Sequence, residues 1–328
     1  MAARLGLSVL APMLALWTTG HMQWSSYALL AAAIAVYERN ATFARRLRTQ
    51  AQVGGCQIAL ITAGTALSGT AAPTWVAVLA TAFVAGGATL LADRRGWLPP
   101  GCLLFVFAFA VSASTAAQPG AVTIALSLST GTVLLTLVIT AATTAYDATN
   151  RLRTAQSKLA PHTAQITSWR LSLTHAAVCL VAAGAAGIAS VALNLGHWYW
   201  AAVAAIVPVV GTTTSSQLLR AGHRILGTTL GLALAAGLFW HPPSGLQLVV
   251  ELSVLLIATE LVVARNYSLA MVFLTPMTIG MVYLGNVQPP LVATLQTRTV
   301  ETIIGVATVT VLILVTHRAR HPRNAHHP

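Results

Sequence analysis

The stretch HWYWAAVAAIVPVVGTTTSSQLLRAGHRILGTTLG, residues 197–231, contains the pattern that decides the fold. Three aromatic residues, Trp198, Tyr199 and Trp200, lead into an apolar run, and Arg220 and Arg224 precede a second apolar run that contains glycines. Aromatic residues gather at membrane–water interfaces, and arginines gather in loops on the cytoplasmic side. The stretch therefore predicts one membrane span that starts at an aromatic belt, a basic cytoplasmic turn, and a second span.

The composition of the whole chain agrees with this interpretation. Of the 328 residues, 56% are hydrophobic and 7% are charged, whereas a soluble domain carries about 25% charged residues. The net charge of +12 would suggest nucleic acid in a soluble protein, but the basic residues here form short clusters between apolar runs. We therefore expect a membrane protein and no nucleic-acid partner.

A membrane-spanning helix needs about 20 mainly apolar residues, and candidates recur from end to end of the chain. They form two series of six: 4–19, 24–38, 53–70, 73–91, 99–117 and 120–145, then 171–195, 197–213, 224–240, 246–264, 267–285 and 294–316. We predict an all-α integral membrane protein with about twelve transmembrane helices. Its expected parts are a first membrane repeat (1–146), a cytoplasmic linker (147–170), a second membrane repeat (171–317) and a basic cytoplasmic tail (318–328).

The distribution of lysine and arginine predicts the orientation of these spans. With the N-terminus in the cytoplasm, the basic residues cluster in the cytoplasmic loops 39–52, 92–98, 146–170, 214–223 and 265–266 and in the tail. The outer loops have no lysine or arginine, and Arg298 alone falls outside the cytoplasmic set. Because cytoplasmic loops carry an excess of these residues, we expect both termini to lie inside a bacterial-type inner membrane.

The two series of spans are related by a constant offset. A shift of 176 residues places His21 on His197, Trp24 on Trp200, Arg48 on Arg224 and Gly55 on Gly231 without a gap. Six spans in each half give both halves the same orientation, which predicts a parallel repeat. Repeats of this kind place a pathway at the interface between the halves.

The stretch 198–235 resembles the fusaric acid resistance protein-like family, whose integral membrane bound transporter domain carries an Arg-x-x-Gly-Thr turn after a Trp/Tyr-led span. In this sequence the turn is Arg224, Gly227 and Thr228. The segments RNYSLAMVFLTP (265–276) and RTVETIIG (298–305) are also similar, and the first half holds degenerate versions, YERNATFARRLRTQ and LPPGCLLFVFA. The resemblance implies an inner-membrane permease related to aromatic acid exporters and, distantly, to plant malate channels. Larger members of the family carry sizeable cytoplasmic helical domains, whereas the predicted spans here are accompanied by a linker of about 25 residues and a short tail.

Charged residues within the spans are candidates for a substrate or proton pathway, because each costs about 2.5–3.5 kcal/mol at the centre of a membrane helix. Glu251, Glu260 and Glu301 are the acids concerned. Glu260 lies five residues from Arg265, so an ion pair with Arg265 or with another loop arginine is an alternative structural role. Glu251 lies near the outer boundary, where a structural role is again the alternative.

Arg298 and Glu301 form the more suggestive pair, since residues three apart share one face of a helix. A local salt bridge that stabilises the helix start is one interpretation. The other is a pathway role, in which Arg298 binds an anion and Glu301 couples proton entry to export, because carboxyl groups in low-dielectric surroundings exchange protons near neutral pH.

Arg224 and Arg48 each open a helix on the predicted cytoplasmic side. As positive charges beside helix N-termini they could attract a carboxylate, and the alternative is a role in topology with contact to lipid phosphate. Gly227 and Gly231 are spaced by four residues, and Gly54 stands beside Gly55. Close helix packing is the expected use of these glycines, against exposure of backbone to substrate.

The sequence carries no enzyme signature, no Walker A motif and no metal-binding cysteine spacing, so we expect no catalysis, cofactor or metal. The expected function is export of small organic, in particular aromatic, carboxylates, driven by the proton gradient. A passive anion channel and a non-transporting membrane scaffold for envelope assembly are the alternatives. Expected partners are the organic anion and membrane lipid, and a homo-oligomer remains open.

Overall fold

The computed structural model describes residues 2–39, 41–116, 118–151, 168–211, 213–263, 265–284 and 289–320. Every regular element in these residues is a helix. The first half contains α1 (Ala2–Thr18), η1 (Met22–Trp24), α2 (Ser25–Ala32), η2 (Ala33–Val36), α3 (Phe43–Ser68), α4 (Thr74–Arg95), α5 (Leu103–Ser114) and α6 (Ala121–Arg151). The second half contains α7 (Trp169–Ala192), α8 (Tyr199–Ile206), η3 (Pro208–Val210), α9 (Thr214–Leu238), α10 (Gly245–Val262), α11 (Tyr267–Val282) and α12 (Leu291–Arg320). Most of the predicted linker and tail lie outside the described residues.

Each predicted span coincides with a helix or with a short helix and its 3₁₀ extension. Among the described residues, α4, α6, α7, α10 and α12 are long and apolar enough to cross a membrane. Five further apolar helical stretches are shorter, such as 103–114 and 199–210. The chain is therefore an all-helical membrane protein, and its twelve spans remain a prediction.

The structure corrects the boundaries of the two basic loops. α3 begins at Phe43 and α9 begins at Thr214, about ten residues before the predicted spans, so Arg45, Arg48 and Arg220 lie on helices rather than in loops. A capping box explains the early start of α9: Thr213 and Ser216 each bond the other's backbone N–H through their side chains. Capping requires polar side chains, so an apolar window cannot detect the polar first turns of a helix.

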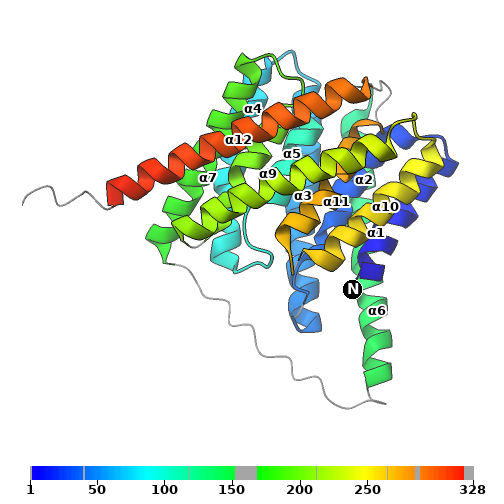
Figure 1. Ribbon diagram of the computed structural model, residues 1–328. Coiled ribbons are helices and arrows are strands. Elements are labelled where there is room, and N and C mark those ends of the chain that lie inside the picture. Colours follow the sequence, from blue (N-terminus) through cyan, green and yellow to red (C-terminus); the bar gives the residue numbers. More distant parts are fainter. Residues whose placement is uncertain are drawn as a thin grey trace, which may run out of the picture.

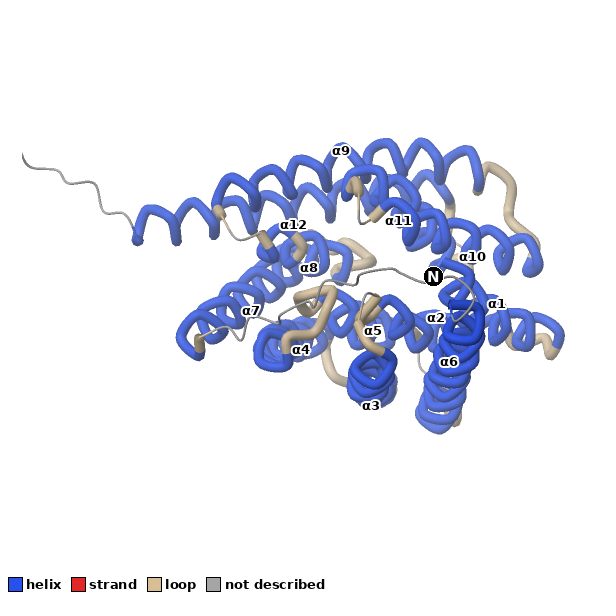
Figure 2. The backbone as a smooth tube through the Cα atoms, turned by 90° about the horizontal axis from the view of Figure 1, so that it is seen from below, coloured by secondary structure: helices blue, strands red, loops and turns tan. Residues whose placement is uncertain are grey.

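Helices at the same place in the two halves pack in the same way. α3 packs against α5 and α6, as α9 packs against α11 and α12. The two halves contact each other at their edges, where α4 packs against α7 and α10 packs against α1. In Figure 1, α9 and α12 run side by side across the front of the molecule, and Figure 2 shows them on the side opposite α3 and α6.

α8 lies at the centre of the second half, where every one of its eight residues is buried. It packs against α12 and α7, and a small residue permits the close approach: a Cβ on Gly305 would collide with the Ala201 carbonyl oxygen. Pro208 follows α8 and ends it in a 3₁₀ turn. The second predicted repeat motif, which begins at His197, therefore continues into a short helix that is buried in the protein.

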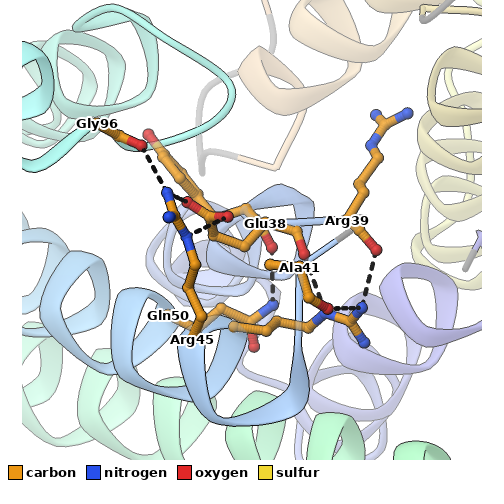
Figure 3. Close-up of polar contacts among 8 residues, drawn as sticks. Glu38, Arg39, Ala41, Arg45, Gln50 and Gly96 are labelled. Atoms are coloured by element: carbon orange, nitrogen blue, oxygen red, sulfur yellow. Dashed lines mark hydrogen bonds and ion pairs between the residues drawn. The ribbon is translucent and has the colours of Figure 1, made fainter. Parts of the chain in front are cut away.

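The turn before α3 is held by a cluster of polar contacts (Figure 3). Arg45 binds the buried Glu38 carboxylate through Nε and Nη2 at 3.1 and 3.2 Å, and Nη2 also donates to the Gly96 carbonyl at 3.1 Å. Arg46 donates to the Glu38, Arg39 and Ala41 carbonyl oxygens. Arg45 therefore links the turn to the loop after α4, and Arg46 stabilises the turn itself. Both arginines have a structural role here, whereas the sequence analysis used them only as indicators of membrane orientation.

Candidate functional site

A cavity of about 110 Å³ lies inside the helix assembly, between elements of both halves. α1, α2, η2 and α5 contribute from the first half, and α8 to α12 contribute from the second. Most of its wall consists of leucine, methionine, phenylalanine and valine side chains. Among the described residues that line it, Arg224 and Arg298 alone carry a charge, and Thr278 adds a hydroxyl group. The cavity thus combines an apolar wall with two cationic groups.

Arg224 lies on the buried face of α9, where its side chain is 1% exposed. Its Nη1 donates to the Tyr267 hydroxyl at 3.4 Å and contacts the Met271 sulfur at 3.7 Å. Its Nε and Nη2 atoms have no hydrogen-bond partner among the described residues. Two donor atoms of this guanidinium are therefore buried without an acceptor among the described residues.

Glycines explain how an arginine is buried at this position. A Cβ on Gly227 would lie 2.5 Å from the Ser268 carbonyl oxygen, and one on Gly231 would lie 2.6 Å from the Thr275 Cβ. α9 and α11 thus approach within backbone contact, which small residues permit. Thr228 lies on the same face, buried, and its hydroxyl has no partner among the described residues.

Arg298 lies on α12 and is also 1% exposed. Its guanidinium carbon lies 4.7 Å from the centroid of the Trp200 ring, a cation–π contact. Trp200 in turn stacks on His197, with ring centroids 4.4 Å apart. The Nε and Nη1 atoms of Arg298 have no hydrogen-bond partner among the described residues. This guanidinium, like that of Arg224, therefore has two donor atoms without an acceptor among the described residues.

Glu301 lies one turn after Arg298 on α12 and is fully buried. Its Oε1 accepts hydrogen bonds from the Ser190 hydroxyl at 3.0 Å and the His197 backbone N–H at 3.1 Å, and its Oε2 has no partner in the described part of the chain. The carboxylate turns toward the end of α7, so the local salt bridge with Arg298 is not formed. α12 begins at Leu291, which places both residues well inside the helix.

The electrostatic consequence is a cationic site whose charge the buried Glu301, one helical turn from Arg298, offsets only in part. Two buried guanidinium groups face one cavity, and four of their nitrogen atoms lack partners among the described residues. Burying unpaired charge is costly, and removing the partner of a buried ion pair costs about 3–5 kcal/mol. A bound anion would supply the missing acceptors, and charge-assisted hydrogen bonds of this kind are roughly twice as strong as neutral ones.

A second hollow of about 290 Å³ adjoins the cavity. Polar residues of both halves line it, among them Gln23 and His197. Phe107, Thr278 and Met281 line both hollows, so these three side chains form the partition between them. His197 therefore faces the larger hollow while its stacking partner Trp200 contacts the arginine of the smaller one.

The remaining sequence candidates lie away from the cavity. Glu260 forms an ion pair with Arg39 at 2.5 Å, and Glu251 accepts a hydrogen bond from Gln247 on its own helix at 2.8 Å. Arg48 is exposed on α3 and does not line the cavity. No group of three His, Cys, Asp or Glu side chains that could hold a metal occurs in the described part of the chain.

Sequence reasoning missed the role of the aromatic residues. Trp198, Tyr199 and Trp200 are buried at 4%, 7% and 0% exposure, so an interfacial belt is the wrong interpretation of this cluster. The repeated His-x-x-Trp pattern was the available signal. His21 and Trp24 stack at 4.3 Å with an interplanar angle of 17°, nearly the geometry of His197 and Trp200, which also meet at 17°.

Comparisons with known proteins agree with the resemblance noted in the sequence. Residues 182–312 match the family model described as fusaric acid resistance protein-like. This range contains Arg224, Arg298 and Glu301. A segment of 91 residues is 33% identical to the uncharacterized membrane protein YvaC of Bacillus subtilis (strain 168), covering 28% of this chain and 14% of that protein. No solved structure matches the chain.

Proposed function

We propose that this protein is a permease for small organic anions, which bind between the guanidinium groups of Arg224 and Arg298. The observation that carries the proposal is the cavity itself, which is lined by two buried arginines whose guanidinium groups keep donor atoms without an acceptor among the described residues. The match of residues 182–312 to a fusaric acid resistance protein-like family supports it. A membrane scaffold has no need of such a site, since an apolar interior without buried charge would be less costly.

The proposed architecture is a pair of parallel six-helix repeats, with twelve spans and both termini in the cytoplasm of the inner membrane. The 176-residue offset, the shared helix order and the equivalent packing in the two halves support the repeat. The basic residues of the predicted inner loops support the orientation. The cavity then lies between the repeats, the usual place for a transport pathway.

The apolar wall favours an anion with a hydrocarbon body over an inorganic ion. Leu29, Phe107 and Met277 line the cavity together with the two arginines, so a carboxylate can contact the guanidinium groups while a ring or short chain contacts the wall. Apolar cavities of about 150 Å³ accommodate benzene, which is of the same order as the 110 Å³ found here. Small aromatic carboxylates are the proposed substrates, and export is the proposed direction.

Glu301 is the proposed proton-coupling group. Its Oε2 is buried with no partner among the residues that the structure describes, while Oε1 accepts hydrogen bonds from Ser190 and His197. A carboxyl group in this environment can gain and lose a proton without a change in its anchoring. It also lies on the same helix as the proposed anion ligand Arg298, which would link the two events.

The test is transport in proteoliposomes, with a labelled panel of aromatic and aliphatic carboxylates and with or without an imposed pH gradient. We expect gradient-dependent movement of aromatic acids, and loss of it in Arg298→Gln. Carboxylate transport that is independent of the pH gradient would identify a channel. No transport of any acid would favour a scaffold. Equal unfolding temperatures of the variant and the parent protein would separate lost transport from lost folding.

Glu301→Gln isolates the coupling. The amide preserves the shape of the side chain but cannot exchange a proton, so anion exchange between equal internal and external pools should persist while the response to the pH gradient disappears. An unchanged response to the gradient in this variant would remove Glu301 from the mechanism.

A further inference from the structure

A groove of about 700 Å³ lies on the surface between the first turns of α9 and α11, outside the cavity. Arg220, His223 and Arg265 line it, and no Asp or Glu occurs among the described residues that do so. None of these three side chains has an ion pair or hydrogen bond with another described residue. Such a cluster attracts negative charge, and nothing in the described protein neutralises it.

Much of the remaining groove wall is made of leucine and valine side chains. Leu226, Leu230 and Leu269 line it and are 54%, 51% and 43% exposed. α9 and α11 run in the same direction here, since Gly227 meets Ser268 while Gly231, one turn later, meets Thr275. The leucines therefore continue along the groove toward the interior of the membrane, away from the basic cluster at the helix starts.

The start of α11 adds to the positive potential at the basic end. Asn266 caps the helix by accepting a hydrogen bond from the Leu269 backbone N–H at 3.1 Å. The first turn of a helix carries partial positive charge on its free N–H groups. This partial charge adds to the positive potential of Arg220 and Arg265, and it would not by itself form a binding site.

We infer that this groove binds an anionic phospholipid, with its phosphate between Arg220, His223 and Arg265 and an acyl chain along the leucines. The division into a basic end and an apolar length matches the two parts of such a molecule. A second copy of the chain fits less well, because a two-fold contact through this patch would place its own arginines near each other.

The groove also touches the proposed anion site. Tyr267 lines the groove, and its hydroxyl accepts the hydrogen bond from Arg224 Nη1. A lipid phosphate at the groove would therefore act on the arginine of the cavity through one intervening side chain. This second consequence rests on the proposed function, whereas binding of the lipid does not.

The test measures the association of spin-labelled phosphatidylglycerol, relative to spin-labelled phosphatidylcholine, with the purified full chain in phosphatidylcholine vesicles. We expect Arg220→Gln/Arg265→Gln to reduce the preference for phosphatidylglycerol, by about fivefold for each arginine. The matched control is Arg95→Gln/Arg170→Gln, which removes the same charge from exposed positions outside the groove. An equal loss in both double variants would overturn the proposal by showing that net charge alone attracts the lipid.

Two further arms complete the design. Soluble glycerol phosphate should not displace the labelled phosphatidylglycerol, and efficient displacement would overturn the lipid assignment in favour of a phosphate site. Tyr267→Phe should retain the lipid preference but lose any effect of phosphatidylglycerol on transport. If the protein moves no anion, the lipid preference of the double variants still decides whether the groove binds lipid.

Discussion

In the first half of the chain, Arg45 and Arg46 fasten the turn before α3 by binding Glu38 and its neighbours. In the second half, Arg220 and Arg224 lie in the N-terminal half of α9 and have no acidic partner among the described residues, and a neutral capping box of Thr213 and Ser216 holds the turn instead. If the two halves are the proposed repeats, the difference shows how one motif has taken different roles in each. Where an acid neutralises the arginines the turn is structural, and where caps replace the acid the arginines remain free to bind a ligand.

The buried polar groups of α3 and α9 differ in the same sense. α3 buries the amides of Gln50 and Gln57, which bond to backbone carbonyl oxygens of Tyr37 and Leu104. α9 buries the guanidinium of Arg224. An amide contributes polarity without charge, so α3 buries neutral polar groups that bind backbone, whereas α9 buries a charged group that lines the cavity.

The largest expected effect comes from replacing, one at a time, the two arginines that the 176-residue offset aligns. Arg224→Gln should weaken anion binding by about 10- to 100-fold, because a hydrogen bond to a charged group contributes about 1.5–3 kcal/mol. Arg48→Gln should change it by less than about twofold, as substitutions at exposed positions usually do. Equilibrium binding of a labelled carboxylate to the purified protein measures both. Equal losses would mean that the two arginines act only through net charge.

A smaller effect is expected from the paired glycines. Gly231→Ala should lower the free energy of unfolding by about 1–3 kcal/mol, because its new Cβ would overlap Thr275 at the α9–α11 contact. Gly55→Ala should raise it by up to about 1 kcal/mol, since a Cβ there meets no atom within 4 Å and alanine favours the helix. Denaturant titration in detergent measures the difference. Two destabilised variants would show that α3 is as tightly packed at Gly55 as α9 is at Gly231.

The smallest effect concerns the turn of the first half. Glu38→Gln should lower the free energy of unfolding by about 1–2 kcal/mol, because it removes charge from a paired carboxylate whose arginine is partly exposed. Transport per folded molecule should be unchanged. Thermal unfolding and transport are measured together, with Glu251→Gln as the control for loss of a carboxylate. A transport defect in folded Glu38→Gln protein would assign function to the first turn as well.

Hydropathy located every helix of the described chain, because apolar runs of this length have few alternatives in a membrane protein. It did not locate the polar starts of α3 and α9, which depend on capping and on side-chain contacts with other elements. It also gave no sign that Ala33–Val36 and Pro208–Val210 are 3₁₀ turns, since such turns are short and depend on the surrounding packing.

For the candidate site, the sequence singled out Arg298 and Glu301 as unusual charges within a predicted span, and Arg224 as a positive charge at the predicted cytoplasmic start of a helix. It did not bring Arg224 and Arg298 together, because they lie on different helices and no spacing rule relates them. It anticipated an ion pair between Glu260 and a loop arginine, but not that the partner would be Arg39 from the other half, nor that Glu301 would keep a carboxylate oxygen without a partner among the described residues. Distinguishing them required knowledge of which helices meet.

The stacking of Trp200 between polar neighbours has a spectroscopic consequence. Its indole is fully buried, its Nε1 has no hydrogen-bond partner among the described residues, and the Arg298 charge lies over its ring. The energy of an indole transition depends on the local electric field, so an anion that neutralises Arg298 would shift the emission of this tryptophan. Tryptophan fluorescence should therefore report on anion binding at the site. The Trp200→Phe variant should not show the shift and serves as the control.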